Sequence, residues 1–568
     1  MSALKALTPP VRPPRRHPSP QNSRAITDAK RRASERLADA PSLFEFMASS
    51  RARTDPGGAP HPTTPRLHVS PTALGRKVHI ESFGCQMNVN DTQLVYGILQ
   101  SAGYGLAETP DDADVILLNT CAVRERAEQK VWSRLAQIRH SARPSRPLVG
   151  VLGCMAERLK EQILEKEKLV DLIAGPDSYR DLPLLLSRAE NGEKAVQVML
   201  SYDETYADVS PVRMSDNGVS AYVSIMRGCN QHCTYCIVPR TRGVERSRPA
   251  DSIEREIREL SLQGYKEVTL LGQNVNSYND KTSFPDHSNL PDVQTAKGFT
   301  TVYRTPKAGV TFAELLDRIS LIDPEMRIRF TSPHPKDFPD PLLRVIQSRP
   351  NVCKALHIPA QSGNSDVLSR MRRGYTRETY LELVAHIRHV LSPNVSLSSD
   401  FIVGFCDESD AEHLDTLSLV QTVQYDQAFI FAYSMREKTP AHRRYLDNVP
   451  AHVKSARLSQ LLDAFRASVT ARNQAKLGTL QLVLVERTSK RNPDTLIGRT
   501  DGNKKVAFPR SPVPTLRQTT PPSDIHFGDY VVVRLTGTLG ISFTGVALAK
   551  ATIAQFAEPG LQDALDLL

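Results

Sequence analysis

Three cysteines in one short segment are the residues of this sequence best suited to chemistry. Cys229, Cys233 and Cys236 form a C-x3-C-x2-C pattern. Three thiolates this close together can hold a cubane [4Fe–4S] cluster and leave one iron open to another ligand, which favours catalysis over simple electron transfer. The alternative is a zinc site completed by a distant ligand such as His232, although this spacing is unusual for zinc.

Three further cysteines are far apart in the sequence but share one setting. Each follows a segment that we predict to be a buried strand: Cys85 follows 78–83, Cys121 follows 113–119 and Cys154 follows 147–152. Because the carboxyl ends of parallel strands line one edge of a sheet, these thiols can converge and bind a second cluster with an open iron. The alternative is three separate core cysteines, since cysteine is often buried in such strands.

The elements around these cysteines alternate between strand and helix. Another strand-like run spans 169–174, and helical spacing covers 91–102 and 125–140. Such alternation predicts a parallel sheet with helices on both faces. We therefore predict an α/β domain with a doubly wound parallel sheet over residues 76–200.

A second α/β series occupies residues 215–470. Helical stretches such as 252–263, 312–322 and 377–390 separate its strands, and six such units predict a full or partial (β/α) barrel. The polar segment 279–309 breaks the rhythm and is predicted to be a surface insertion. Cys353 and Cys406 have no partners at ligand spacing, and we interpret both as structural. The strand-like runs are 221–226, 267–271, 327–331, 355–358, 396–403 and 427–431.

Helical periodicity disappears in residues 472–550. The runs 478–486 and 530–536 alternate as strands do, and 509–522 is a loop rich in Pro, Ser and Thr. These features predict a small all-β barrel. Residues 551–568 contain three acidic residues and no basic ones, so we predict an acidic C-terminal tail.

The net charge of +10 is concentrated near the ends of the chain. Residues 1–70 and 472–550 each hold 12 Lys/Arg and 5 Asp/Glu, a net +7, whereas 71–471 carries −1 and 551–568 carries −3. A basic barrel indicates a nucleic acid partner, with an ordinary solvated surface as the alternative for any one residue. No run reaches the ~20 apolar residues of a membrane-spanning helix, so we expect no membrane partner. Candidate phosphate contacts in the barrel are Arg487, Lys490, Arg491, Arg499, Lys504 and Lys505.

The basic N-terminal region has a composition of its own. It holds 11 of the 40 prolines, and no acidic residue precedes Asp28. An Arg-rich, acid-poor start is typical of an organelle transit peptide, and a disordered basic tail is the alternative. We predict a mitochondrial destination, with plastid or cytoplasm as alternatives.

The cysteines and their neighbours resemble those of the radical S-adenosylmethionine (SAM) methylthiotransferases. The resemblance runs from about residue 76 to about 548 and includes the terminal barrel, which is similar to the family's RNA-binding TRAM domain. The matching segments are Gly84–Asn88, Asn119–Cys121, Gly153–Arg158 and the 229/233/236 cysteines.

Within this family, two segments resemble the branch that acts on N6-dimethylallyladenosine in tRNA. They are Cys85–Asn88 and Thr241–Pro249. Other segments resemble the eukaryotic organellar subgroup, which also shares the cysteine of Gly404–Ser409 where bacterial members often have proline. These segments are Arg327–Asp340, Gln361–Gly363, Met371–Tyr375, Phe429–Arg436, Gly298–Phe299 and Val302–Tyr303.

The resemblance implies an enzyme that adds sulfur and methyl at C2 of N6-dimethylallyladenosine, at position 37 in the anticodon loop of tRNA. Its cofactors would be SAM and two [4Fe–4S] clusters. Cys229, Cys233 and Cys236 would hold the catalytic cluster, and Cys85, Cys121 and Cys154 the auxiliary one. We expect a monomer reduced by an electron-donor protein of unknown identity. The competing hypotheses are a non-catalytic interaction protein and an enzyme of the same mechanism acting on threonylcarbamoyladenosine.

Overall fold

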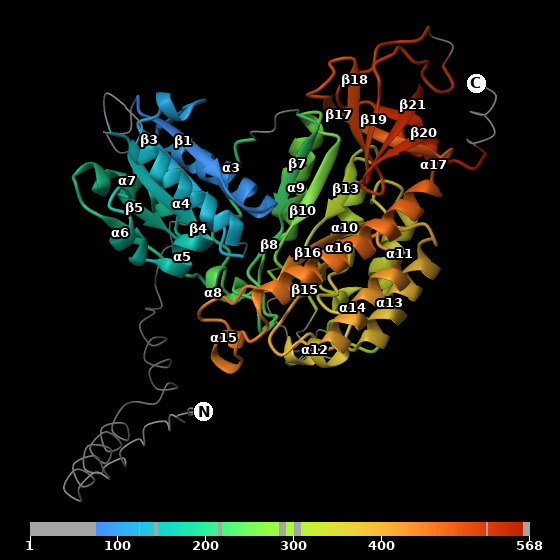
Figure 1. Cartoon of the computed structure of the whole chain (residues 1–568). Coiled ribbons are helices and arrows are strands. Elements are labelled where there is room, and N and C mark those ends of the chain that lie inside the picture. Colours follow the sequence, from blue (N-terminus) through green and yellow to red (C-terminus); the bar gives the residue numbers. More distant parts are fainter. Residues whose placement is uncertain are drawn as a thin grey trace, which may run out of the picture. The chain divides into compact units, whose positions relative to one another are not determined.

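The computed structural model describes most of the chain as α/β structure followed by a small β-barrel (Figure 1). The predicted transit segment 1–70 lies outside the described residues. Where the chain is described, no helix is long and apolar enough to cross a lipid bilayer. The described residues are 75–123, 125–140, 146–213, 218–282, 291–299, 308–518 and 521–560.

The N-terminal domain is a six-stranded parallel sheet in the order β2-β1-β3-β4-β5-β6. Side chains that alternate along the strands form one apolar core on each face, with α3 and α7 over one face and α4, α5 and α6 over the other. This confirms the predicted doubly wound sheet. The strands are β1 Lys77–Ser82, β2 Gly105–Leu106, β3 Val115–Thr120, β4 Leu148–Gly153, β5 Leu172–Ala174 and β6 Ala195–Gln197. The helices are α3 Gln86–Ser101, α4 Glu125–His140, α5 Cys154–Leu159, α6 Gln162–Lys166 and α7 Leu182–Glu190, with single 3-10 turns at Pro110–Asp112 and Tyr179–Asp181.

Helix α3 begins at Gln86, earlier than the helix predicted over 91–102. Its first turns are polar but buried, so the apolar periodicity starts later than the helix does. Asn88 donates from Nδ2 to the Phe83 carbonyl at 2.7 Å, and Asp91 has no exposed surface. Buried polar groups of this kind are satisfied by specific partners that the sequence pattern does not reveal.

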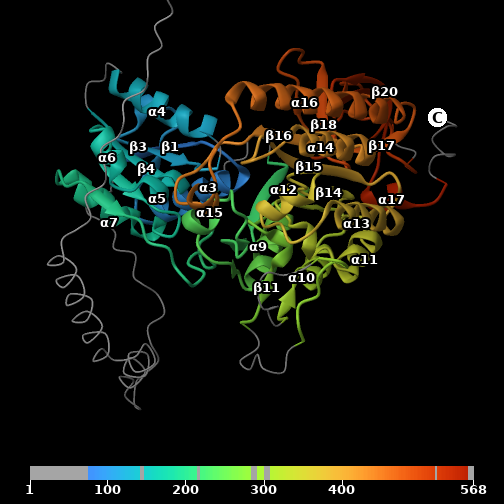
Figure 2. The ribbon, with the colours of Figure 1, turned by 60° about the horizontal axis from the view of Figure 1, so that its bottom comes forward.

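The central domain is a partial parallel barrel built from two three-stranded sheets, β13-β10-β7 and β14-β15-β16. A single parallel bridge between Ile328 and Val352 joins them. The helices lie around the outside of the strands (Figure 2) and share one apolar core with them. The strands are β7 Ser220–Ser224, β10 Glu267–Leu271, β13 Arg327–Phe330, β14 Ala355–His357, β15 Ser396–Val403 and β16 Gln427–Ala432; β8 Met226–Arg227 pairs with β9 Arg246–Ser247. The helices are α8 Val238–Thr241, α9 Ala250–Leu262, α10 Phe312–Ser320, α11 Asp340–Ser348, α12 Ser365–Arg370, α13 Arg377–Val390, α14 Asp410–Val423, α15 Pro440–Arg444 and α16 Ala451–Gln474.

The polarity of the segment 279–309 predicted a surface insertion, but part of this segment is paired in strands and buried in the core. Strand β11 (Asn279–Asp280) pairs with β12 (Val310–Thr311), which closes the segment at its base. Ala296 and Phe299 are buried in the main core, and the Phe299 ring lies 5.1 Å from that of Tyr375. Residues 283–290 and 300–307, which include Val302–Tyr303, lie outside the described residues.

The C-terminal domain is the predicted β-barrel, closed in the order β17-β18-β19-β21-β20. Helix α16 leads into it and packs on α14 and β16. Residues 551–557 are not a free acidic tail, because the short helix α17 (Ile553–Ala557) buries Ile553 and its first two N–H groups donate to the Glu325 carboxylate. The strands are β17 Leu480–Thr488, β18 Thr495–Thr500, β19 Lys505–Pro509, β20 Tyr530–Leu539 and β21 Ser542–Lys550.

Candidate active site

The three widely spaced cysteines, here called the distributed triad, lie at one edge of the N-terminal sheet. Cys85, Cys121 and Cys154 directly follow β1, β3 and β4, which are adjacent strands. Cys121 and Cys154 are buried and Cys85 is half-buried. Burial raises the pKa of the Cys154 thiol; Arg242 lowers this pKa, and the nearby Cys85 thiolate raises it further. The structure thus brings these residues to the edge where the strand pattern placed them.

Two glycines allow this close approach. Gly84 has φ +125°, and a Cβ there would lie 2.5 Å from Cβ of Cys121. Gly153 has φ +88°, and a Cβ there would lie 2.6 Å from Oδ1 of Asn119. Both positions combine a backbone conformation that L side chains rarely adopt with no space for a side chain.

The second set, here called the local triad, lies in the loop between β8 and α8. Cys229 and Cys233 are buried and Cys236 is half-buried. Burial, the Glu245 carboxylate and the other two thiolates raise the pKa of Cys229. Burial and the Cys233 thiolate raise the pKa of Cys236 to about 12. These thiols therefore lie close enough to repel one another as thiolates.

Hydrogen-bond donors face the local triad. The N–H of Gln231 donates to Sγ of Cys229 at 3.4 Å, and Nη1 of Arg373 donates to Sγ of Cys233 at 3.3 Å. Gly228, at φ +76°, lets the loop pass the next segment, since a Cβ there would lie 1.9 Å from the Val244 carbonyl oxygen. The arrangement holds negative charge on sulfur, as a cluster-binding loop requires.

The side chain of Arg242 joins the central domain to the distributed triad. Its Nε donates to Sγ of Cys154 at 3.0 Å, and its Nη2 donates to Oδ1 of Asn88 at 3.1 Å. Its Nη1 pairs with Oδ2 of Asp91 at 2.6 Å. Arg242 directly follows α8, which packs on α5, the helix that begins at Cys154. One buried guanidinium from the central domain therefore fixes a cysteine of the N-terminal domain.

Asp91 is shared by a second arginine. Nη2 of Arg227 donates to Oδ1 of Asp91 at 2.9 Å, and the Arg227 guanidinium lies 4.6 Å from the Tyr206 ring centroid. The sequence pattern did not single out Asp91 or Arg227. Arg242 and Arg373 lie in segments that were noted only for the family resemblance, Thr241–Pro249 and Met371–Tyr375. The contacts of these residues span long stretches of sequence, so local patterns could not identify them.

The terminal barrel is attached through another buried carboxylate, Glu267. It pairs with Arg329 at 2.7 Å and with Arg499 of the barrel. Arg329 also donates to the carbonyls of Thr500 and Asp501, both at 2.8 Å. Burial alone would raise the pKa of Glu267, but Arg329 and Arg499 lower it to about 2.

Two of the six barrel residues predicted to contact phosphates instead bind groups within the protein, so the prediction is wrong for them. Arg499 pairs with Glu267 and Glu486, and Lys504 is buried with its Nζ donating to the Asp426 carbonyl at 2.6 Å. Burial lowers the pKa of Lys504 to about 8. The remaining candidates are exposed and available to a partner: Arg487, Lys490, Arg491 and Lys505.

No three His, Cys, Asp or Glu side chains in the described part of the chain converge closely enough to hold a single metal ion. Cys353 and Cys406 are both buried, in agreement with a structural role.

Three family descriptions match successive parts of the chain. Residues 77–175 match the uncharacterized protein family UPF0004, residues 223–420 the radical SAM superfamily, and residues 474–545 the TRAM domain. Membership of the radical SAM superfamily implies SAM and a [4Fe–4S] cluster. The local triad fits such a cluster, because it offers three adjacent thiols with N–H donors directed at two of them.

Named relatives cover nearly the whole chain. The human mitochondrial tRNA methylthiotransferase CDK5RAP1 is 51% identical over 94% of this chain and 92% of its own length. The tRNA-2-methylthio-N(6)-dimethylallyladenosine synthase of Chloroherpeton thalassium is 48% identical over 83% of this chain and 96% of its own. Among solved structures, the radical SAM methyltransferase TsrM from Kitasatospora setae aligns at TM-score 0.46 and 14% identity over 65% of this chain and 75% of its own. The identities and coverage of the named relatives show that this chain belongs to the tRNA methylthiotransferase family of the radical SAM superfamily.

Proposed function

We propose that this protein adds sulfur and methyl at C2 of N6-dimethylallyladenosine at position 37 of tRNA. The observation that carries the proposal is that Arg242, which directly follows the helix after Cys236, donates to Cys154 of the distributed triad. A single site with two groups of thiols suits a reaction that needs both hydrogen abstraction and sulfur delivery.

Different residues of the chain support hydrogen abstraction and sulfur delivery. When bound, the cluster and SAM supply a carbon radical able to abstract the hydrogen from C2, an unactivated C–H group. Cys229, Cys233 and Cys236 hold the catalytic [4Fe–4S] cluster, and Arg373 supports the charge on Cys233. Cys85, Cys121 and Cys154 hold a second [4Fe–4S] cluster, which Arg242 orients through Cys154. Burial of both triads keeps water away from the reacting atoms.

The substrate is tRNA, and the TRAM barrel presents exposed basic side chains to its phosphates. Anticodon-loop bases can leave the stack without breaking a duplex, so the base can reach a buried site at low cost. The enzyme acts as a monomer and depends on an electron-donor protein. Its destination is the mitochondrion, which a fluorescent reporter fused to residues 1–70 would test.

The experiment that tests the proposal is nucleoside mass spectrometry of tRNA from a deletion strain, separated by compartment. The 2-methylthio modification of N6-dimethylallyladenosine should disappear from organellar tRNA. An unchanged profile in every compartment would contradict the proposal. Loss of 2-methylthio-threonylcarbamoyladenosine instead would assign the enzyme to the other substrate.

Cysteine variants separate the two triads. Anaerobically prepared protein should bind about eight irons per chain, and Cys229→Ala or Cys121→Ala should each remove about half of them. Cys229→Ala should abolish SAM cleavage, whereas Cys121→Ala should retain it and lose methylthio product. Cys353→Ala is the matched control, because this cysteine is buried outside both triads. Equal iron loss in the control would refute the assignment of the ligands.

A further inference from the structure

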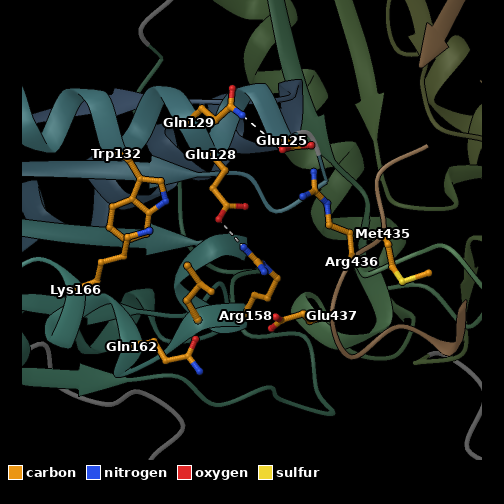
Figure 3. Close-up of a pocket in the computed structure, with 11 residues that line it drawn as sticks. Glu125, Glu128, Gln129, Trp132, Arg158, Gln162, Lys166, Met435, Arg436 and Glu437 are labelled. Atoms are coloured by element: carbon orange, nitrogen blue, oxygen red, sulfur yellow. Dashed lines mark hydrogen bonds and ion pairs between the residues drawn. The ribbon is translucent and has the colours of Figure 1, made fainter. Parts of the chain in front are cut away.

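A pocket of about 400 Å³ is lined in part by Glu125 and Arg158, which follow Cys121 and Cys154 closely in the sequence (Figure 3). Its walls come from three segments, α4, the α5–α6 region and the loop that follows β16. A hydrogen bond from Ser434 to Glu125 at 2.8 Å and one from Lys438 Nζ to the Arg158 carbonyl at 3.3 Å join that loop to the N-terminal domain. The pocket is therefore built by two domains.

The position of the pocket is tied to the cysteines. Glu125 begins α4 shortly after Cys121, and Arg158 lies one helical turn after Cys154 on α5. On the other side, Met435 follows the carboxyl end of β16, the end of a barrel strand at which substrates bind in this fold. An occupant of the pocket would therefore contact α4 and α5, the helices that follow Cys121 and Cys154.

The lining offers an aromatic face together with charges of both signs. Trp132 is the only tryptophan of the chain, and Nζ of Lys166 lies 4.3 Å from its ring centroid. Arg158 is 9% exposed and donates from Nη2 to Glu128 at 2.7 Å, while its Nε is buried and makes no hydrogen bond. Figure 3 shows Glu128 and Arg158 pointing toward each other, with Trp132 on one side and Arg436 and Glu437 on the other.

We propose that this pocket binds a nucleobase of the tRNA anticodon loop other than the base being modified. The assignment rests on the proposed function and names a second contact for the same substrate. A base can stack on Trp132 in place of the Lys166 ammonium that now covers the ring. Its edge carries donors and acceptors that can match Arg158 and Glu128, which pair with each other in this structure. Its phosphate can pair with Lys166 or Arg436.

Other ligand classes fit this lining less well. A small anion would use Lys166 or Arg436 but would leave the aromatic face of Trp132 and the three glutamates without a partner. The charged walls would disfavour an apolar molecule. The volume is sufficient for a nucleotide. A base splayed into this pocket would also fix the position of the loop while its neighbour enters the catalytic site, so the pocket acts in substrate positioning.

Trp132 makes the proposal directly measurable, since it is the only fluorophore excited at long ultraviolet wavelengths. Holoenzyme is titrated with an anticodon stem-loop, and Trp132 emission and the anisotropy of labelled RNA are followed together. We expect the stem-loop to quench Trp132 emission. Replacing one loop position other than 37 by an abasic site should remove the quenching, whereas abasic sites elsewhere in the loop should leave it.

Variants at and near the pocket give the matched comparison. Trp132→Ala should weaken stem-loop binding about tenfold, and Trp132→Phe should recover most of the loss because it keeps a stacking face. Lys130→Ala is the control, because Lys130 is exposed on the same helix and does not line the pocket. Iron content should remain that of the wild type in all three.

The outcomes distinguish this proposal from the function on which it rests. Stem-loop binding without any change in Trp132 emission, and with unchanged affinity for Trp132→Ala, would overturn the pocket assignment alone. Equal quenching by free nucleoside monophosphates at the same concentration would identify a small-molecule site and overturn the RNA assignment. Absence of any stem-loop binding would contradict both the pocket and the proposed function.

Discussion

Two carboxylates with no exposed surface, Asp91 and Glu267, lie where the central domain meets its two neighbours. Each is paired with two arginines. At the first interface, Arg242 also reaches Sγ of Cys154, whereas at the second Arg329 donates to backbone carbonyls of the barrel. A similar charge arrangement therefore supports the cysteine site at one interface and the attachment of a domain at the other.

The difference shows that the role of a buried ion pair depends on the other hydrogen bonds that its arginines make. A buried pair adds little net stability, because desolvation of both charges offsets their attraction, but removal of one partner leaves a costly unpaired charge. Breaking the Glu267 interface should therefore affect mainly stability. Breaking the Asp91 interface at Arg242 should affect mainly chemistry.

The largest expected effect follows from Glu267→Gln. The substitution leaves the buried Arg329 without its carboxylate and removes one of the two carboxylates that pair with Arg499. We expect a loss of about 3–5 kcal/mol in the free energy of unfolding, measured by chemical denaturation. Glu259→Gln, at an exposed position on α9, should stay close to the wild type. A loss below about 1 kcal/mol would show that the interface does not depend on this charge.

The same carboxylate predicts a pH dependence. Burial raises the pKa of Glu267, but Arg329 and Arg499 overcome this and hold it at about 2, below its ordinary value of about 4.5. The stabilisation is therefore complete above about pH 4.5 and is lost as the pH falls toward 2, about 3 kcal/mol in total. The stability difference between the wild type and Glu267→Gln should shrink over this range in denaturation midpoints taken at several pH values. A constant difference would contradict the assignment to Glu267.

At the first interface we expect Arg242→Gln to lower methylthio product about 10- to 100-fold, the range found when a group that supports a metal ligand is lost. SAM cleavage should remain, because the local triad is untouched. Arg242→Lys should recover little of the lost methylthio product, because one ammonium group cannot donate to Cys154, Asn88 and Asp91 together. The electron paramagnetic resonance signal of the auxiliary cluster should change in both variants.

Arg240→Gln is the matched control for Arg242, because Arg240 is exposed on α8 just before it. Its product yield and cluster spectra should equal those of the wild type. If Arg242→Gln lost SAM cleavage and methylthio product to the same extent, Arg242 would serve the central domain as a whole. The contrast between the two interfaces would then fail.

Sequence reasoning located the thiols because the relevant rules are local. Buried strands have a recognisable composition, and the residue after a parallel strand lies at a known edge of the sheet. Cys85, Cys121 and Cys154 could therefore be grouped from the sequence, and the C-x3-C-x2-C loop needed no tertiary information.

The residues that support the thiols could not be predicted in the same way. Arg242 lies 88 positions from Cys154, and its buried partner Asp91 stands in a helical turn with polar spacing. In the barrel, Arg499 and Arg487 alternate with apolar residues in similar ways, yet Arg499 is half-buried against Glu267 and Arg487 is exposed. Their difference depends on which face of the barrel meets the central domain, and this is a property of the assembled fold.

The smallest expected effect concerns the exposed basic residues of the barrel and completes the contrast with Glu267. Lys490 and Arg491 lie in the turn between β17 and β18, both exposed. The double variant Lys490→Gln/Arg491→Gln should weaken tRNA binding a few-fold. It should also reduce the magnitude of the slope of log K against log salt concentration by about 1.5, because each lost phosphate contact lowers that slope by about 0.7–0.9. Binding isotherms at several salt concentrations measure both quantities, and unfolding midpoints should equal those of the wild type. A stability loss comparable with that of Glu267→Gln would place these side chains in the attachment of the barrel instead, because a solvated charge contributes little to folding but a phosphate contact contributes directly to binding.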